Sequence, residues 1–120
     1  ALLEYEFRRG GSNRLGFETI TAAGANATTL HYVKNDQRIG PDDMVLLDAG
    51  CEYGYITSDV TRTFPAGKHF SEAQRDIYTA VLDAQKASIT KVRPGNTYQD
   101  VHMAAVYVLS ERMRDLGILT

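Results

Sequence analysis

The spacing of hydrophobic residues predicts a short helix at the start of the chain. Leu2, Leu3 and Phe7 can share one helical face, and Gly10-Gly11 supplies a C-terminal stop after two arginines. The chain has no initial methionine, and its first helix has no N-cap. We therefore expect the sequence to be a piece of a larger protein.

From residue 16 the pattern changes to the alternation that is typical of strands. Residues 16–24 alternate, with Phe17 and Thr19 on one side and Ile20 and Ala22 on the other. Residues 28–33 are a second β-rich run, and residues 34–43 are rich in turn-forming types. Residues 44–50 and 55–64 then predict two further strands around the connection 51–54.

Two helices are predicted after the strands. Ser71 and Gln74 have the spacing of a capping box, and the helix that they begin ends at the Arg-Pro-Gly sequence of residues 93–95. A second helix begins near Thr97 and ends at Gly117. The apolar stripes consist of Ile77, Val81 and Ala84 in the first helix and Val101, Ala104, Ala105 and Val108 in the second. Four strands followed by two helices predict an α+β fold, with the helices covering an antiparallel sheet.

Two aspartates lie eleven positions apart within the last pair of strands. If a two-residue turn is centred between Tyr53 and Gly54, Asp48 and Asp59 face each other directly across the hairpin. Opposed side chains have Cβ atoms about 4.5–5.5 Å apart, and two carboxylates at that separation need a cation between them. Two-metal hydrolases hold their ions roughly 3.5–4 Å apart, so the spacing is compatible with such a site. By strand parity Thr61 shares the face of Asp59, and its hydroxyl is a candidate hydrogen-bond partner for a metal ligand.

The residues alone also allow structural interpretations. Asp48 could begin a turn with Ala49-Gly50, and Asp59 could pair with Arg62 at a strand edge. Against the first alternative, Asp48 follows three apolar residues that indicate a buried strand, where an aspartate needs a partner. His31, a lone histidine in a predicted strand, is by itself more typical of a structural residue.

Composition narrows the function classes. The 120 residues suit one domain, and a net charge of −2 gives no electrostatic case for binding nucleic acid or an acidic membrane surface. A single cysteine excludes an internal disulfide, and no apolar run approaches the ~20 residues that cross a bilayer. Nucleic acid and membranes are therefore not expected as partners, and a homo-oligomer is left open.

Three segments carry a family resemblance: "HYVKND" at 31–36, "LLDAGCEYGYITSDVTRTFP" at 46–65 and "FSEAQRDIY" at 70–78. They resemble the Xaa-Pro aminopeptidases, members of the pita-bread metallopeptidases that also include prolidases and methionine aminopeptidases. The resemblance runs from about Phe7 to the last residue. It implies that residues 1–120 are a partial catalytic domain, the N-terminal half of a pita-bread domain.

The resemblance also assigns residues. It implies that Asp48 and Asp59 are ligands of a dinuclear metal site, with Mn²⁺ expected and Co²⁺ or Zn²⁺ as alternatives. It implies that His31 contacts the substrate or the developing tetrahedral intermediate. The family site needs a further histidine and two glutamates, which are expected beyond Thr120.

The implied activity is removal of the N-terminal residue from peptides with proline in second position. A prolidase, which is restricted to dipeptides, and a non-catalytic pita-bread binding module are the alternatives. This chain by itself is expected to be inactive. The expected location is the cytoplasm, with the mitochondrion as the alternative.

Overall fold

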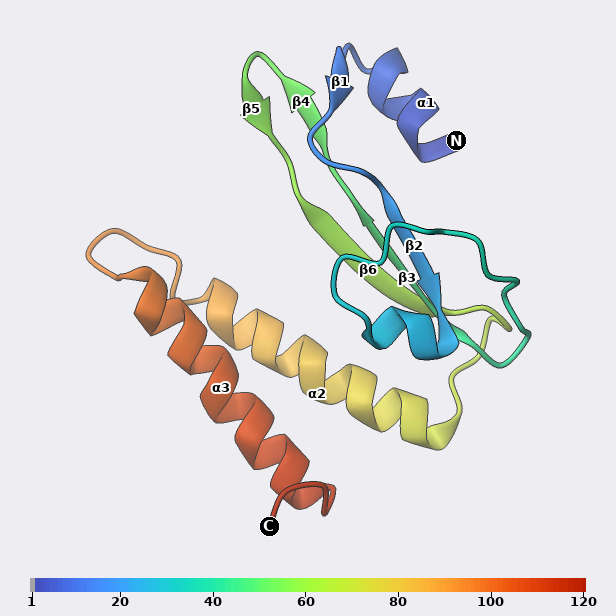
Figure 1. Cartoon of the computed structure of the whole chain (residues 1–120). Helices are drawn as coiled ribbons and strands as arrows, with labels where there is room; N and C mark the ends of the chain where they lie inside the picture. The colour runs from blue at the N-terminus through green and yellow to red at the C-terminus, as the bar shows by residue number, and fades with distance from the viewer. Residues whose placement is uncertain (1) are drawn as a thin grey trace. The chain divides into compact units, whose positions relative to one another are not determined.

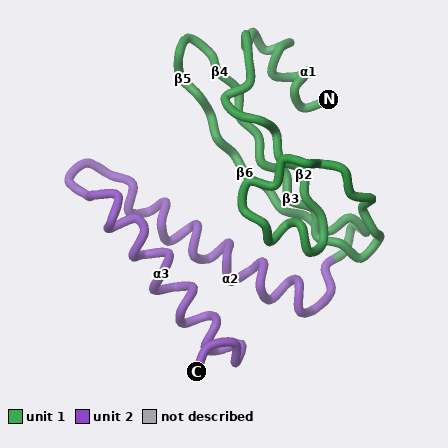
Figure 2. Tube along the Cα trace, viewed as in Figure 1, with its two compact units in different colours: residues 1–69 green, residues 70–120 purple. Residues whose placement is uncertain are grey.

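The computed structural model describes residues 2–120, which form two compact units, residues 2–69 and residues 70–120 (Figure 2). The first unit begins with a helix, and its other elements are mostly short strands (Figure 1). Its elements are α1 (Leu2–Arg9), β1 (Arg14–Leu15), β2 (Ile20–Ala23), the 3₁₀ helix η1 (Gly24–Thr28), β3 (Met44–Ala49), β4 (Cys51–Tyr53), β5 (Ile56–Thr57) and β6 (Val60–Pro65). The second unit contains α2 (Glu72–Ile89) and α3 (Tyr98–Asp115).

The strands form two antiparallel sheets with the orders β1-β4-β5 and β2-β3-β6. The segments β3-β4 and β5-β6 are the two arms of one long hairpin, interrupted at Gly50 and at Ser58-Asp59. One register continues through both parts, since Tyr53 lies opposite Ile56 and Leu47 lies opposite Arg62. The predicted pair of strands is therefore confirmed.

The hairpin turn lies one residue later than the sequence pattern predicted. Gly54 and Tyr55 occupy the loop with φ angles of 57° and 68°, as a type I′ turn requires. The Tyr55 amide donates to Glu52 Oε1 at 2.5 Å, and Arg14 Nε donates to Glu52 Oε2 at 2.8 Å. The buried Glu52 carboxylate thus holds the displaced turn, while Tyr53 remains in the strand and pairs with Ile56.

The predicted strand at residues 28–33 is wrong. Residues 24–28 form η1 instead, and His31 has a φ of 56°, which is incompatible with an extended strand. The predicted strand at 16–24 is shorter than expected, because only Ile20–Ala23 pairs with β3. Within it, Ile20 and Ala22, which the alternation placed on one side, are both buried.

The second unit is a helical hairpin whose helix starts agree with the sequence. Ser71 and Thr97 are the N-caps of α2 and α3, and each closes a capping box with the side chain of the residue three positions later. The stripe predicted for α3 is half-buried throughout, but on α2 the buried residues are Ala80 and Ala84, while Ile77 and Val81 are exposed. No helix in residues 2–120 has the length and apolar character that spanning a membrane requires.

Candidate metal centre

Asp48 lies on the central strand of the β2-β3-β6 sheet, between Ile20 on one side and Thr61 on the other. Asp48 is half-buried on this strand. Its Oδ1 atom is buried, and no hydrogen-bond donor contacts it within residues 2–120. A buried acceptor without a partner costs about 1–3 kcal/mol. The atom is therefore suited to a cationic ligand, which would satisfy the oxygen.

Asp59 immediately precedes β6 and is exposed. The direct opposition of the two aspartates that the sequence predicted is wrong, since the residue opposite Asp48 is Thr61. The cause is the shift of the turn to Gly54-Tyr55, which moves one strand by two residues relative to the other. Asp59 comes two residues before Thr61, so strand alternation favours the same sheet face as Asp48 in a diagonal relation.

Thr61 becomes the direct cross-strand neighbour of Asp48 in this register. Opposed residues bring their Cβ atoms to about 4.5–5.5 Å, which is compatible with a hydrogen bond from a threonine hydroxyl to an aspartate carboxylate. The expected role of Thr61 beside a metal ligand stays a prediction, and the register gives it a specific partner.

Gly50 allows three segments to converge two residues after Asp48. Its carbonyl accepts the Gly16 amide at 2.9 Å. A Cβ atom at position 50 would lie 1.7 Å from the Ser58 carbonyl oxygen and 2.8 Å from Phe17 Cε1. The hairpin therefore requires glycine at position 50, close to the aspartates. The sequence suggested only that Gly50 could belong to a turn.

His31 lies in the loop of residues 29–39, which we call the histidine loop. It is exposed and adopts the left-handed conformation. The next residue, Tyr32, donates its hydroxyl hydrogen to Asp36 Oδ1 at 2.7 Å and accepts from Asn26 Nδ2 at 3.0 Å. The hydrogen bond to Asp36, with a smaller contribution from burial, raises the pKa of Tyr32 above its ordinary value of 10.0. Side-chain hydrogen bonds thus fix the backbone directly after His31.

Asn35, also in the histidine loop, was missed by sequence reasoning. Its side chain accepts from the Thr21 amide at 2.6 Å and donates to the Thr19 carbonyl at 2.8 Å. It has a φ of 51°, in the left-handed region that asparagine tolerates better than most residues. The Asn-Asp sequence in a turn-rich segment was the available signal, but it does not identify the strand that the side chain would reach.

The expected ligands do not form a complete centre in this part of the chain. Among residues 2–120, no group of three or more histidine, cysteine, aspartate or glutamate side chains is arranged to hold a metal ion. The two aspartates lie on one hairpin, whereas His31 lies on a separate loop.

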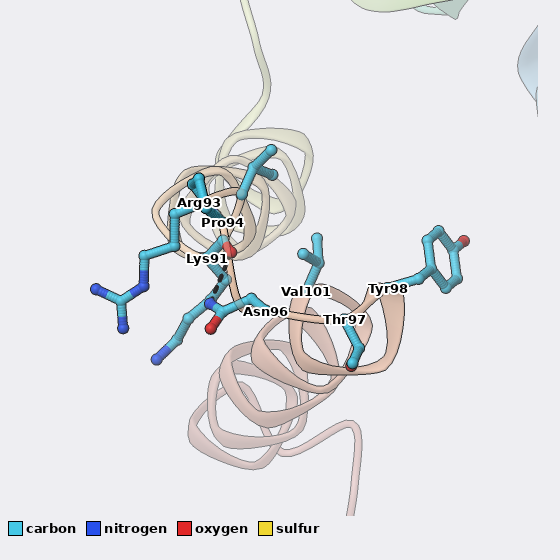
Figure 3. A pocket seen from close by; sticks show the side chains of 8 residues that line it. Lys91, Arg93, Pro94, Asn96, Thr97, Tyr98 and Val101 are labelled. Carbon is cyan, nitrogen blue, oxygen red and sulfur yellow. Dashed lines mark hydrogen bonds between the residues drawn. The ribbon is translucent and has the colours of Figure 1, made fainter.

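An open hollow at the α2–α3 connection offers no competing cation site. It is lined by Lys91, Val92, Arg93, Pro94, Asn96, Thr97, Tyr98 and Val101 (Figure 3). These side chains include two cations and no carboxylate. Asn96 Nδ2 donates to the Lys91 carbonyl at 2.8 Å, a hydrogen bond within the α2–α3 connection.

Known proteins are similar to this chain in sequence and in structure. Residues 1–118 match metallopeptidase family M24. Xaa-Pro aminopeptidase 1 of Streptomyces coelicolor is 49% identical over 108 residues, which are 89% of this chain and 22% of that protein. The structure of Pseudomonas aeruginosa aminopeptidase PepP has a TM-score of 0.95 at 45% identity, over 98% of this chain and 27% of that one.

Solved structures of Escherichia coli aminopeptidase P are also similar. Two of them, each with a TM-score of 0.92, carry alanine in place of aspartates that lie eleven positions apart. They are 38% and 37% identical to this chain, covering 97% and 98% of it and 26% and 27% of their own length. A further structure is zinc-substituted and contains the product.

This chain spans about a quarter of the length of the relatives that it matches. Over that stretch it has the α+β, pita-bread architecture of aminopeptidase P, so the expected fold class is confirmed. With a family match over almost its entire length, the chain belongs to metallopeptidase family M24.

Proposed function

We propose that the complete protein containing this chain is a metal-dependent aminopeptidase that removes the first residue from peptides with proline in second position. The observation that carries the proposal is the buried, unpartnered Asp48 Oδ1 on a central strand. The similarity to Xaa-Pro aminopeptidases supplies the substrate class.

Asp48 and Asp59 would hold two divalent ions. Carboxylate oxygens suit such ions, and Mn²⁺ is our expectation, with Co²⁺ or Zn²⁺ as alternatives. The aspartate spacing supports this assignment, because the alanine variants of the E. coli enzyme also concern aspartates eleven positions apart. The remaining ligands, one histidine and two glutamates, are expected beyond Thr120.

When bound, the ions would supply an activated water and polarise the scissile carbonyl. Asp48 and Asp59 would fix the positions of both ions from the two arms of the hairpin. The Thr61 hydroxyl would donate to the Asp48 carboxylate and so orient it. His31 would orient the substrate or donate to the oxyanion that develops during attack.

The isolated 120 residues would bind manganese weakly and leave Xaa-Pro peptides intact, since two aspartates leave most positions around each ion to water. Within residues 2–120, β6 is an edge strand that pairs only with β3. An unpaired edge favours association with another chain, so we expect the isolated chain to self-associate. The cytoplasm is the proposed location, and a mitochondrial relative in Arabidopsis thaliana keeps the alternative open.

The test is a peptidase assay of the complete protein loaded with manganese. Release of the first residue from a proline-second tripeptide, and none after chelation, is the expected result. Turnover of Xaa-Pro dipeptides alone would replace the proposal with a prolidase. Stoichiometric manganese without turnover of either substrate would indicate a binding module instead.

A further inference from the structure

One side chain of the histidine loop is hydrogen-bonded to the backbone of the sheet. Asn35 uses both ends of its amide, accepting from the Thr21 N–H and donating to the Thr19 C=O. Both backbone groups belong to the segment that contains β2, on either side of Ile20. The amide therefore makes, at the β2 edge, the pair of hydrogen bonds that a neighbouring strand would make.

The point of attachment is close to the candidate metal centre in the ladder. Ile20, the residue between the two hydrogen bonds, is the cross-strand partner of Asp48. One path from His31 to Asp48 therefore runs through the loop backbone, the Asn35 amide, one residue of β2 and one cross-strand pair of the sheet. No other side chain of the histidine loop has a hydrogen bond to β2 among those that the structure gives for residues 2–120.

The rest of the loop is braced internally. Tyr32 is bonded to Asn26 and Asp36, and the Asn26 amide also donates to Gln37. These contacts join parts of residues 26–37 to each other and to η1. They keep the loop compact and tie it to η1, which contacts β2 and β3. Asn35 adds a direct attachment of the loop to the backbone of the β2 segment.

We propose that Asn35 is a positioning residue that holds His31 at a fixed place relative to Asp48, an inference that rests on the proposed function of both residues. The alternative is that Asn35 only blocks the β2 edge against association. The two roles differ in their consequences, since only positioning makes the effect of an Asn35 substitution depend on His31.

The informative substitution is Asn35→Gly. Glycine adopts the observed φ of 51° without strain, so the variant deletes the two hydrogen bonds and preserves the backbone conformation. Asn35→Asp is the conservative partner, because it keeps the acceptor for Thr21 and loses the donor to Thr19. Asn96→Gly is the matched control, since it deletes another asparagine bond to a backbone carbonyl in the other unit.

The first readout needs no activity. The chain has three histidines, and their imidazole NMR signals can be assigned by single substitutions in the complete protein. We expect Asn35→Gly to shift and broaden the His31 signal, to leave those of His69 and His102 in place, and to speed amide exchange at Thr21. A His31 signal that is identical in the variant and the parent would overturn the proposal, whether or not the parent is a peptidase.

The second readout is a double-mutant cycle in the manganese-loaded protein. We expect Asn35→Gly to lower kcat about ten- to a hundredfold with manganese content unchanged, Asn35→Asp to lower it less, and Asn96→Gly to have no effect. Combined with His31→Gln, Asn35→Gly should cause no further loss, because both changes remove the same contribution. Losses that multiply in the double variant would show that Asn35 acts independently of His31 and would overturn the proposal. A parent without turnover would defeat the proposed function, and the His31 signal would then decide the positioning claim.

Discussion

Asp48 and His31, the two residues with the clearest candidate roles, are held by different kinds of structure. Asp48 lies within β3, where neighbouring strands on both sides supply backbone hydrogen bonds. His31 lies in a loop without regular structure, and side-chain amides, a phenol and a carboxylate supply the bonds around it.

The difference affects how each position responds to sequence change. A backbone ladder forms with almost any side chain, so the location of Asp48 depends on register and on the few sites where only glycine fits. The histidine loop depends on individual side chains, each of which a single substitution can remove. We therefore expect a disruptive substitution in the hairpin to unfold the whole hairpin. In the histidine loop, each substitution should remove one contact and loosen the loop gradually.

The largest effect that tests this contrast is expected at Asp48 itself. Asp48→Asn should lower turnover of the complete protein more than about 10³-fold, because the proposed function makes Asp48 a metal ligand on which water activation would depend. Calorimetric titration with manganese should show the loss of binding directly. Asp76→Asn, at an exposed position of α2, is the control and should change neither quantity.

The same variant also tests the unpartnered oxygen. If Asp48 Oδ1 has no structural partner, metal-free Asp48→Asn should unfold within about 1 kcal/mol of the parent in urea. A destabilisation above about 2 kcal/mol would mean that the carboxylate makes structural hydrogen bonds, and the metal assignment would lose its main support.

Substitution of Gly50 should have the next largest effect, and it tests whether the hairpin unfolds as a whole. Gly50→Ala places a Cβ atom 1.7 Å from the Ser58 carbonyl oxygen, so strand separation is unavoidable. We expect the free energy of unfolding to fall by more than about 4 kcal/mol, measured by urea denaturation of the complete protein.

Gly54→Ala is the matched control in the same hairpin. Its Cβ atom meets nothing within 4 Å, and only the φ of 57° opposes the substitution. The expected cost is about 1–2 kcal/mol. Equal losses in the two variants would contradict the close approach at Gly50.

The smallest effect concerns pH and the stepwise loosening of the histidine loop. The folded-state pKa of Tyr32 is raised above 10.0 because its hydroxyl donates to Asp36. A raised pKa means that the stabilisation is complete below pH 10.0 and is lost as the pH rises through the folded value. Above pH 10 the loop should therefore loosen while the hairpin amides stay protected from exchange.

Carbon-13 NMR of the tyrosine ring carbons measures this titration, and Tyr32→Phe assigns the signal. Asp36→Asn should bring the Tyr32 pKa back toward 10.0, since the neutral amide is a weaker acceptor. An unchanged Tyr32 pKa in that variant would show that Asp36 is not the cause.

The sequence by itself determined the local elements whose signals lie within a few residues of each other. The capping box at Ser71 fixed the start of α2, the start of α3 was placed near Thr97, and the apolar run before Asp48 indicated a buried strand. Helix caps and strand alternation are short-range properties, so they can be read without knowing the fold. The long motif of residues 46–65 was equally informative about the family.

Only the tertiary structure decided the register of the hairpin and the form of the histidine loop. The register depends on the Glu52 carboxylate, which accepts the Tyr55 amide and is itself bonded to Arg14, 38 residues away. Residues 28–33 have β-forming side chains, yet the edge of β2 where they could have paired is bonded to the Asn35 amide. Both outcomes rest on contacts between residues distant in sequence, and the energy of such contacts does not appear in any local pattern.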